Sequence, residues 1–317
     1  EPFLEFDLIK KIVCYVKENW KDYKIRFSAT TNGTLINKEV EKWLIEQKSN
    51  FECVLSLDGT PEMQNCNRPY LNGEGSYEKV NIAFFVNNYT EPRAKMTLSK
   101  ETLPYLYEGV AHLHKIGFSP VADLAAAANY WDDEDFAIFE RELKKLVEFY
   151  CDNEQYEICR MLNYDLRRVF IGKDVPFQYC GAGKNMITYD VDGSWYPCMA
   201  LAPVSQGEKA EIFKNETFKT FRFSKDNLCK DCEYVRLCRN CYAANFNQTG
   251  SIEKQTALQC KLNRLTILAS AKIQFSRLMH KYESQKKVIY EDELVLKAIY
   301  KINKVAVDYQ DKFLKDA

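Results

Sequence analysis

Two closely spaced pairs of cysteines constrain the fold of this chain more than any other feature of its sequence. Cys229 and Cys232 form one C-x-x-C pair, Cys238 and Cys241 form a second pair after five intervening residues, and Cys260 follows shortly downstream. Thiolates on such short tethers can converge on one or two soft metal centres with little loop-closure entropy. Two disulfides or a structural zinc site would use the same spacing, so three interpretations are open at this point.

The distribution of the twelve cysteines favours metal binding over a disulfide framework. Five are scattered through the first half, mostly within apolar or helical patterns, where a cysteine usually behaves as a small buried hydrophobic residue. A secreted disulfide framework would be unusual beside so large a portion of ordinary composition, with 46% hydrophobic and 28% charged residues. We therefore expect a reducing, cytoplasmic compartment and thiolate–metal bonds. The remaining seven cysteines are Cys180, Cys198, Cys229, Cys232, Cys238, Cys241 and Cys260.

Charge and hydropathy argue against two classes of partner. A net charge of −1 provides no basic surface for nucleic acid, and no apolar run in the sequence is long enough to span a bilayer. Only three histidines occur, which weakens any histidine-centred hydrolase. His112 and His114 are expected on one helix, on different faces and at the surface.

The first 170 residues alternate between strand-like and helix-like segments. Strand patterns over 25–31, 53–57, 94–98 and 119–124 are separated by stretches with the 3.6-residue period of a helix. Asn37, and Asp132 or Asp133, stand where helix N-caps are expected. Repeated strand–helix units predict an α/β fold with a parallel sheet, either a partial barrel or an open doubly wound sheet. In both, functional residues collect at the carboxyl ends of the strands, here near 30–32 and 56–58.

The pattern changes after about residue 170. Segments 186–191 and 194–198 predict a hairpin around Asp192 and Gly193, and helices are expected over 262–282 and 291–313. These changes predict three parts: a partial barrel over 1–170, a small α+β cysteine-rich domain over 171–282, and a helical tail over 283–317.

Seven clustered thiols do not make two complete four-cysteine sites. One closed zinc site would leave three thiolates unused, whereas two [4Fe–4S] clusters accommodate seven because one iron can keep an open position. Gly181 and Gly183, beside Cys180, would let backbone N–H groups approach a cluster without obstruction by a Cβ atom.

The order of these cysteines resembles the SPASM domain of radical S-adenosylmethionine (SAM) enzymes. The matching pattern is Cys180, a gap, Gly193-Ser-Trp-Tyr-Pro-Cys198, C-x2-C-x5-C, a close fourth cysteine, and Cys260. The family has three residues between the last clustered pair, whereas this chain has two, Arg239 and Asn240. The resemblance implies the following ligands: Cys180, Cys198 and Cys241 for a first auxiliary cluster with an open iron, and Cys229, Cys232, Cys238 and Cys260 for a second.

The first half resembles the same family at its strand ends. Glu1 and Pro2 resemble the end of the Gly-Gly-Glu-Pro motif that contacts SAM. Thr31 and Asn32, then Ser56 and Asp58 with Arg68 after them, resemble the next two strand ends of the radical SAM barrel. The resemblance implies that Glu1, Pro2, Thr31, Asn32, Ser56 and Arg68 bind the cofactor, with Asp58 as a polar group near substrate or SAM or as a turn residue.

One family motif does not occur in these 317 residues. The family cleaves SAM at a cluster held by C-x3-C-x2-C, and no such triplet is present. If Glu1 and Pro2 belong to the second barrel strand, the triplet lies upstream. We therefore expect an N-terminally truncated piece that binds auxiliary clusters and is inactive alone.

The resemblance implies a radical SAM/SPASM oxidoreductase that matures a ribosomal peptide or protein by hydrogen abstraction. Thioether crosslinking is favoured because a substrate thiol could bind the open iron of the first cluster, and sulfatase-type formylglycine maturation is the nearest sibling. The implied cofactors are SAM, two auxiliary [4Fe–4S] clusters and a third cluster in the intact protein. An external electron donor such as ferredoxin or flavodoxin is implied as partner. The alternatives are a truncated non-catalytic iron–sulfur scaffold and a zinc-stabilised binding module.

Overall fold

The computed structural model describes residues 1–125, 131–172, 180–218, 229, 232–285 and 289–308. The chain divides into two compact units, one made of residues 1–125 and 137–163, and the other of residues 126–136 and 164–317. Each unit is described on its own. The expected tail, 283–317, falls within the second unit, while the finer boundaries of the cysteine-rich domain stay a prediction.

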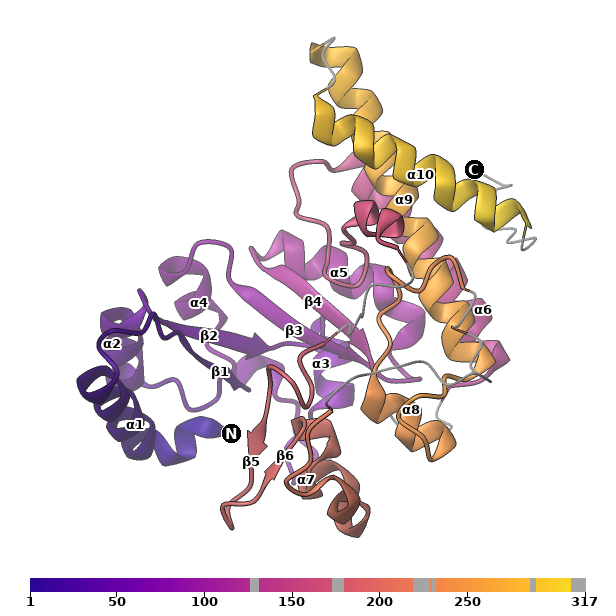
Figure 1. The fold of residues 1–317 in the computed structure, drawn as a ribbon. Coiled ribbons are helices and arrows are strands. Elements are labelled where there is room, and N and C mark those ends of the chain that lie inside the picture. Colours follow the sequence, from indigo (N-terminus) through magenta and orange to yellow (C-terminus); the bar gives the residue numbers. More distant parts are fainter. Residues whose placement is uncertain (126–130, 173–179, 219–228, 230–231, 286–288, 309–317) are drawn as a thin grey trace. The chain divides into compact units, whose positions relative to one another are not determined.

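A four-stranded parallel sheet forms the centre of the first unit (Figure 1). Its strands are β1 (Phe27–Thr31), β2 (Phe51–Ser56), β3 (Arg93–Leu98) and β4 (Ser119–Leu124), and they lie side by side in sequence order. Each strand therefore pairs with its predecessor, without the reversal of direction that defines a doubly wound sheet. The α/β class is confirmed, and the winding in one direction is that of a barrel wall.

Helices connect the strands and give each crossover enough length to return to the same edge of the sheet. Asn37 caps the helix between β1 and β2, because its Oδ1 accepts the N–H groups of Glu39 and Val40 at 3.0 and 3.1 Å. Asp132 caps the helix after β4 in the same way. Both caps follow the sequence prediction. The helices are α1 (Phe6–Asn19), α2 (Lys38–Gln47), α3 (Pro61–Asn67), α4 (Ile82–Asn88), α5 (Leu106–Lys115) and α6 (Asp133–Asp152), with 3-10 turns η1 (Pro2–Glu5), η2 (Tyr77–Lys79) and η3 (Leu103–Tyr105).

His114 corrects the expectation that both histidines of α5 lie at the surface. It is buried, its Nε2 lies 2.8 Å from Tyr150 Oη, and its ring stacks on Tyr156 with 4.6 Å between ring centroids. The Tyr150 hydroxyl also accepts the N–H of Cys159 at 3.0 Å. The imidazole is thus a packed hydrogen-bonding member of the core, where aromatic rings of α6 cover it.

His112 carries a pH prediction for this unit. Its Nε2 lies 2.9 Å from Tyr77 Oη, and burial lowers its pKa, an effect that the Glu62 carboxylate opposes more weakly. The folded state therefore binds the proton less readily than the unfolded state, and stability should fall as the pH drops below about 6.5. Urea unfolding at pH 7.5 and 5.5 should show a smaller loss for His112→Gln than for the unaltered chain. Equal losses in the two proteins would contradict the assignment.

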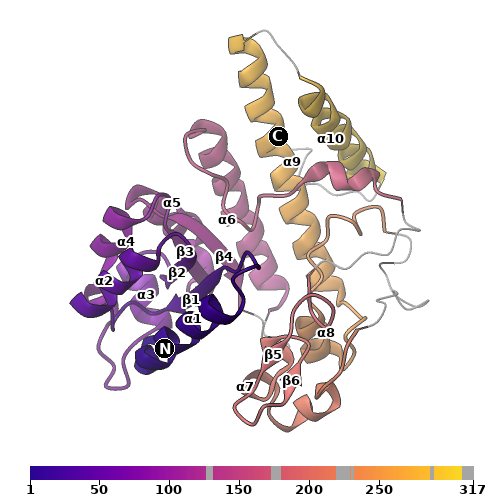
Figure 2. The same cartoon turned by 60° about the vertical axis from the view of Figure 1, so that its left-hand side comes forward.

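The second unit is a small sheet with helices and irregular segments (Figure 2). The expected hairpin is present as the antiparallel strands β5 (Thr188–Tyr189) and β6 (Trp195–Tyr196). A buried cluster around Leu201, Phe213 and Ala243 packs against β6. The other elements are η4 (Leu166–Phe170), η5 (Met199–Leu201), α7 (Pro203–Gln206), η6 (Gly207–Phe213), α8 (Tyr242–Thr249), α9 (Ala257–Gln285) and α10 (Tyr290–Asp308).

The C-terminal helix α10 packs within this unit against η4 and α9. Tyr234, in the cysteine-rich segment, is 1% exposed and donates its hydroxyl to the carbonyl oxygen of Ile302 at 3.3 Å. The helix therefore packs against the segment that carries the cysteines. Among the helices of the described ranges, none combines the length and apolar character that a membrane crossing needs.

Candidate functional site

The carboxyl end of β1 is joined to the first residue of the chain by hydrogen bonds. Glu1 Oε1 accepts the Thr31 hydroxyl at 2.8 Å, and Glu1 Oε2 accepts the N–H of Asn32 at 2.7 Å. Pro2 follows in the first turn of η1, where a missing N–H costs nothing. Glu1, Thr31 and Asn32, which the resemblance assigns to cofactor binding, therefore form one group.

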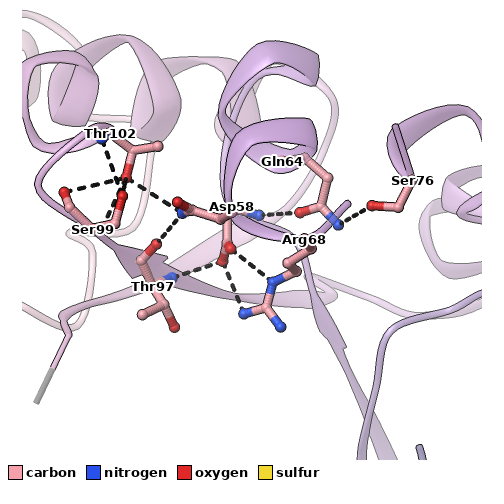
Figure 3. A network of polar contacts seen from close by, with 8 residues as sticks. Asp58, Gln64, Arg68, Ser76, Thr97, Ser99 and Thr102 are labelled. Carbon is pink, nitrogen blue, oxygen red and sulfur yellow. Dashed lines mark hydrogen bonds and ion pairs between the residues drawn. The ribbon is translucent and has the colours of Figure 1, made fainter. Parts of the chain in front are cut away.

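A buried ion pair lies at the carboxyl end of the neighbouring strand β2 (Figure 3). Asp58 is 1% exposed, and Arg68 reaches it with two N–H groups, Nε to Oδ2 at 2.7 Å and Nη2 to Oδ1 at 3.1 Å. Oδ1 also accepts the N–H of Thr97, at the end of β3, at 2.8 Å. The Asp58 carboxylate thus ties the ends of β2 and β3 to Arg68, the C-cap residue of α3.

The backbone at Asp58 is held as firmly as its side chain. Its N–H donates to Gln64 Oε1 at 2.8 Å, and Gln64 donates through Nε2 to Ser76 Oγ at 3.2 Å (Figure 3). Gln64 and Ser76 are both buried, so this chain of hydrogen bonds is shielded from water. Ser56 is also buried, at the end of β2 in register with Lys95 of β3. Ser56 belongs to the same strand ends.

Three cysteines of the second unit form a first electrostatically coupled set. Burial raises the pKa of the Cys180 thiol, and the neighbouring charge of Cys241 raises it further. Burial likewise raises the pKa of Cys198, with smaller contributions from Cys241 and Cys180. Backbone hydrogen bonds lower both pKa values: Ala182 provides one to Cys180, and each of two residues that follow Cys198 provides one to Cys198. These backbone hydrogen bonds stabilise negative charge on the two sulfurs, as a bound thiolate requires.

Four other cysteines form a second coupled set. Burial raises the pKa of Cys229 to about 12, and the charges of Cys232 and Cys260 contribute to the rise while Arg264 opposes it. Burial also raises the pKa of Cys238, and Cys229, Cys232 and Cys260 add to the effect. Thiols that disfavour ionisation in each other's presence would be ionised together only beside a compensating positive charge. The donor set therefore fits a soft metal group bound by thiolates.

The thiols are spread more widely than the ligands of a single ion. In the part of the chain that the structure describes, no three His, Cys, Asp or Glu side chains gather closely enough to hold one metal ion. A four-iron cluster takes each thiolate on a different iron, so its ligands stand further apart than those of one zinc.

Helix N-termini hold a cysteine from each set. Cys241 is the N-cap residue of α8, and Cys260 lies in the first turn of α9. The first turn of α9 is fixed by Thr256, whose hydroxyl accepts the N–H of Gln259 at 3.2 Å. The partial positive charge at a helix N-terminus stabilises negative charge on a nearby sulfur.

Gly183 corrects one detail of the sequence analysis. Its N–H donates to the carbonyl oxygens of Met186 and Pro197 at 3.1 and 3.0 Å, so it does not serve a cluster as expected; Ala182 provides the backbone contact to Cys180. Gly183 is needed for another reason. Its φ is +66°, and a Cβ atom would come within 2.8 Å of the backbone nitrogen of Phe218.

Two side-chain amides beside the cysteines were not found by sequence reasoning. Gln255 is buried within reach of two thiols. Asn240 is 6% exposed; its Oδ1 accepts from Asn245 at 2.8 Å, while its Nδ2 has no hydrogen-bond partner among the described residues. The position of Asn240 inside a C-x-x-C pair was a usable signal. Gln255, in a loop five residues before Cys260, carried none.

Comparison with known proteins identifies the second unit's cysteine-rich part. A family model, SPASM, described as an iron–sulfur cluster-binding domain, matches residues 180–242. The "Cysteine-type anaerobic sulfatase-maturating enzyme" of Clostridium perfringens is 27% identical over 248 residues, which is 70% of this chain and 66% of that protein. The enzyme of the same name from Clostridium novyi is 25% identical over 268 residues, covering 76% and 70%. The chain thus spans about two thirds of the length of these curated relatives.

A solved structure resembles the chain over most of its length. "Native anSMEcpe with bound AdoMet" matches with a TM-score of 0.63 and 22% identity, covering 90% of this chain and 83% of that one. At this identity the likeness establishes the fold. The α/β fold with a partial barrel, expected from the sequence, is confirmed.

Proposed function

We propose that this chain, which matches an iron–sulfur cluster-binding family over residues 180–242 and the fold of a solved structure with bound AdoMet, belongs to a radical SAM/SPASM maturase that modifies a peptide or protein. The observation that carries the proposal is the match of residues 180–242 to an iron–sulfur cluster-binding family. The charge interactions among the seven thiols support their division into a set of three and a set of four. A set of three leaves one iron of a four-iron cluster without a cysteine, which is the open position that a substrate group would need.

The residues of this chain would have distinct tasks in such an enzyme. Cys180, Cys198 and Cys241 would hold the first auxiliary cluster, and the set of four would hold the second. When bound, these clusters would supply one-electron transfer. The Glu1 carboxylate fixes the loop at Thr31 and Asn32, so that its remaining polar groups are oriented at the strand end for SAM.

Asp58 is proposed as a positioning residue. Both of its oxygens already accept hydrogen bonds from Arg68, and one also accepts from Thr97. A carboxylate so occupied is poorly placed to take a proton from a substrate. Its task is to orient the Arg68 guanidinium, whose side chain is 33% exposed and can meet an anionic group.

The proposed substrate is a peptide or protein that presents a thiol. One solved structure with the same fold is "Native anSMEcpe with bound AdoMet and Kp18Cys peptide". Thioether crosslinking is the reaction we favour, because a substrate sulfur is a suitable ligand for the open iron. The names of the sequence relatives favour the second candidate, oxidation of a sulfatase residue. Ferredoxin or flavodoxin would donate electrons, and thiolate-bound clusters suit the cytoplasm.

The non-catalytic scaffold and the zinc-binding module lead to different metal contents. Anaerobic reconstitution with iron and sulfide should yield about eight irons with matching acid-labile sulfide per chain, and electron paramagnetic resonance (EPR) signals of two reduced clusters. One tightly bound zinc and no sulfide would instead establish the zinc module.

Activity needs a separate measurement on the full-length gene product. The C-x3-C-x2-C triplet that would hold the SAM cluster is not among these 317 residues. The full-length protein with a reductant should cleave SAM and change the mass of a cysteine-containing peptide. Loading of both auxiliary clusters without SAM cleavage would favour the scaffold.

A further inference from the structure

Gln255 is the polar side chain placed most directly against the set of four thiols. It is 7% exposed and lies in the loop that leads into α9. Its Oε1 lies 3.7 Å from Cys229 Sγ and 3.9 Å from Cys238 Sγ, and its Nε2 lies 4.0 Å from Cys238 Sγ. One buried amide therefore contacts two of the four sulfurs.

The neighbouring helix cap fixes the backbone next to Gln255. Thr256 caps α9 by accepting the N–H of Gln259, and the Thr256 hydroxyl itself donates to Gln248 Oε1 at 3.1 Å. The carbonyl oxygen of Thr256 accepts the N–H of Cys260 at 3.0 Å. Gln255 thus immediately precedes a backbone segment that also orients a third thiol of the set.

The direction of the hydrogen bonds between Gln255 and the sulfurs depends on whether the sulfurs are protonated or bound to iron. A protonated thiol can donate to the amide oxygen, whereas a thiolate bound to iron has no proton and can only accept. The two ends of an amide have nearly the same shape, so a half-turn of the side chain exchanges the oxygen for the NH2 group without a change in volume. With a cluster present, Gln255 would then face the sulfurs with its two N–H donors.

We propose that Gln255 donates N–H···S hydrogen bonds to Cys229 and Cys238 and raises the reduction potential of the cluster held by the set of four. Reduction adds negative charge to a cluster, and hydrogen bonds to its sulfurs stabilise that added charge. The inference rests on the proposed ligation by these cysteines and adds a specific determinant of their redox behaviour. Under this inference, the two proposed clusters of one domain have reduction potentials that are set by different side chains.

The test is an EPR-monitored redox titration of the reconstituted chain with Gln255→Leu, which removes both donors at similar size. At a fixed solution potential near the midpoint, the ratio of reduced to oxidised cluster should fall about tenfold, equivalent to 59 mV for one electron, in one cluster only. Gln255→Glu keeps the shape of the side chain and adds a negative charge, so the same cluster should shift further in the same direction.

Gln274→Leu is the matched control. Gln274 is a partly buried amide on the same helix α9 that bonds to Ser270 and to the carbonyl oxygen of Tyr164. It lies fourteen residues beyond Cys260, about 21 Å along the helix, so both potentials should stay unchanged.

The outcomes separate this inference from the proposed function. Unchanged potentials in both Gln255 variants, with about eight irons retained, would overturn the role of Gln255 and leave the ligation standing. Failure of the unaltered chain to take up iron and sulfide would overturn the ligation itself. If Gln255→Leu loses iron, its reduction potential cannot be compared with that of the unaltered chain. The redox titration of Gln255→Glu then tests the role of Gln255, because glutamate preserves the packing volume.

Discussion

Replacing Cys260 by Ala should cost the reconstituted chain one cluster and leave the other intact. Cys260 contributes charge to the pKa of both Cys229 and Cys238, with which it is proposed to hold the second cluster. Iron content should fall from about eight to about four per chain, and one of the two EPR signals should vanish. The reciprocal variant Cys198→Ala should remove the other signal.

The design needs one stricter variant and one control. Because three cysteines are proposed to suffice for the first cluster, three could also retain the second weakly; Cys232→Ala combined with Cys260→Ala leaves only two. Cys66→Ala, at an exposed thiol on α3, should keep all the iron. Persistence of both EPR signals in the double variant would show that the cysteines are assigned to the wrong sets. Loss of both signals from Cys260→Ala alone would show that one cluster is not stable without the other.

Arg68→Ala should destabilise the first unit by about 1–3 kcal/mol, the range for leaving a buried hydrogen-bonding group without its partners. The cost arises because Asp58, 1% exposed, would keep its carboxylate without the two guanidinium hydrogen bonds. Denaturant unfolding followed by tryptophan fluorescence measures the change. Arg68→Lys should recover part of the loss, since an ammonium group restores charge without the paired geometry.

An exposed ion pair in the same sheet provides the matched control. Arg93 on β3 pairs with Glu52 on β2, and both side chains are about half exposed at 48% and 47%. Arg93→Ala should therefore cost only about 0–1 kcal/mol. A similar cost for both arginine variants would contradict the view that burial makes the Asp58 pair important. If Arg68→Ala is as stable as the unaltered chain, the ion pair adds nothing to stability and the proposed positioning role of Asp58 is wrong.

Local signals predicted the framework of the first unit well. Strands and helices followed from apolar periodicity, and Asn37 and Asp132 were recognisable as caps because a side-chain oxygen before a helix satisfies nearby N–H groups. Strand order did not follow from these patterns, which fit both a partial barrel and a doubly wound sheet; the structure places each strand beside its predecessor. The grouping of Glu1 with Thr31 and Asn32 was expected from the family resemblance alone, because Glu1 precedes a 3-10 turn and does not end a strand of the sheet.

Contacts between segments distant in sequence were the part that could not be predicted. The burial of His114 depends on Tyr150, thirty-six residues away on another helix, and nothing at His114 itself signals it. Gln255 approaches Cys229 from twenty-six residues away. Gly183 was correctly singled out, but its reason is a positive φ and the nearby Phe218 rather than a sulfur. Spacing along the chain constrains nearby ligands, whereas such packing partners are set by the tertiary fold.

The short connection between Cys238 and Cys241, with two intervening residues, affects the reduction potentials of the two proposed clusters. A chain of three peptide steps reaches at most about 10 Å between the Cα atoms of these cysteines, which belong to different thiol sets. An electron on one proposed cluster would therefore repel an electron arriving at the other through a poorly screened protein interior. Even clusters of equal intrinsic potential would be reduced in two separate steps. This short connection would therefore make reduction of one proposed cluster lower the reduction potential of the other. Over a range of potentials, the two clusters together would hold a single electron.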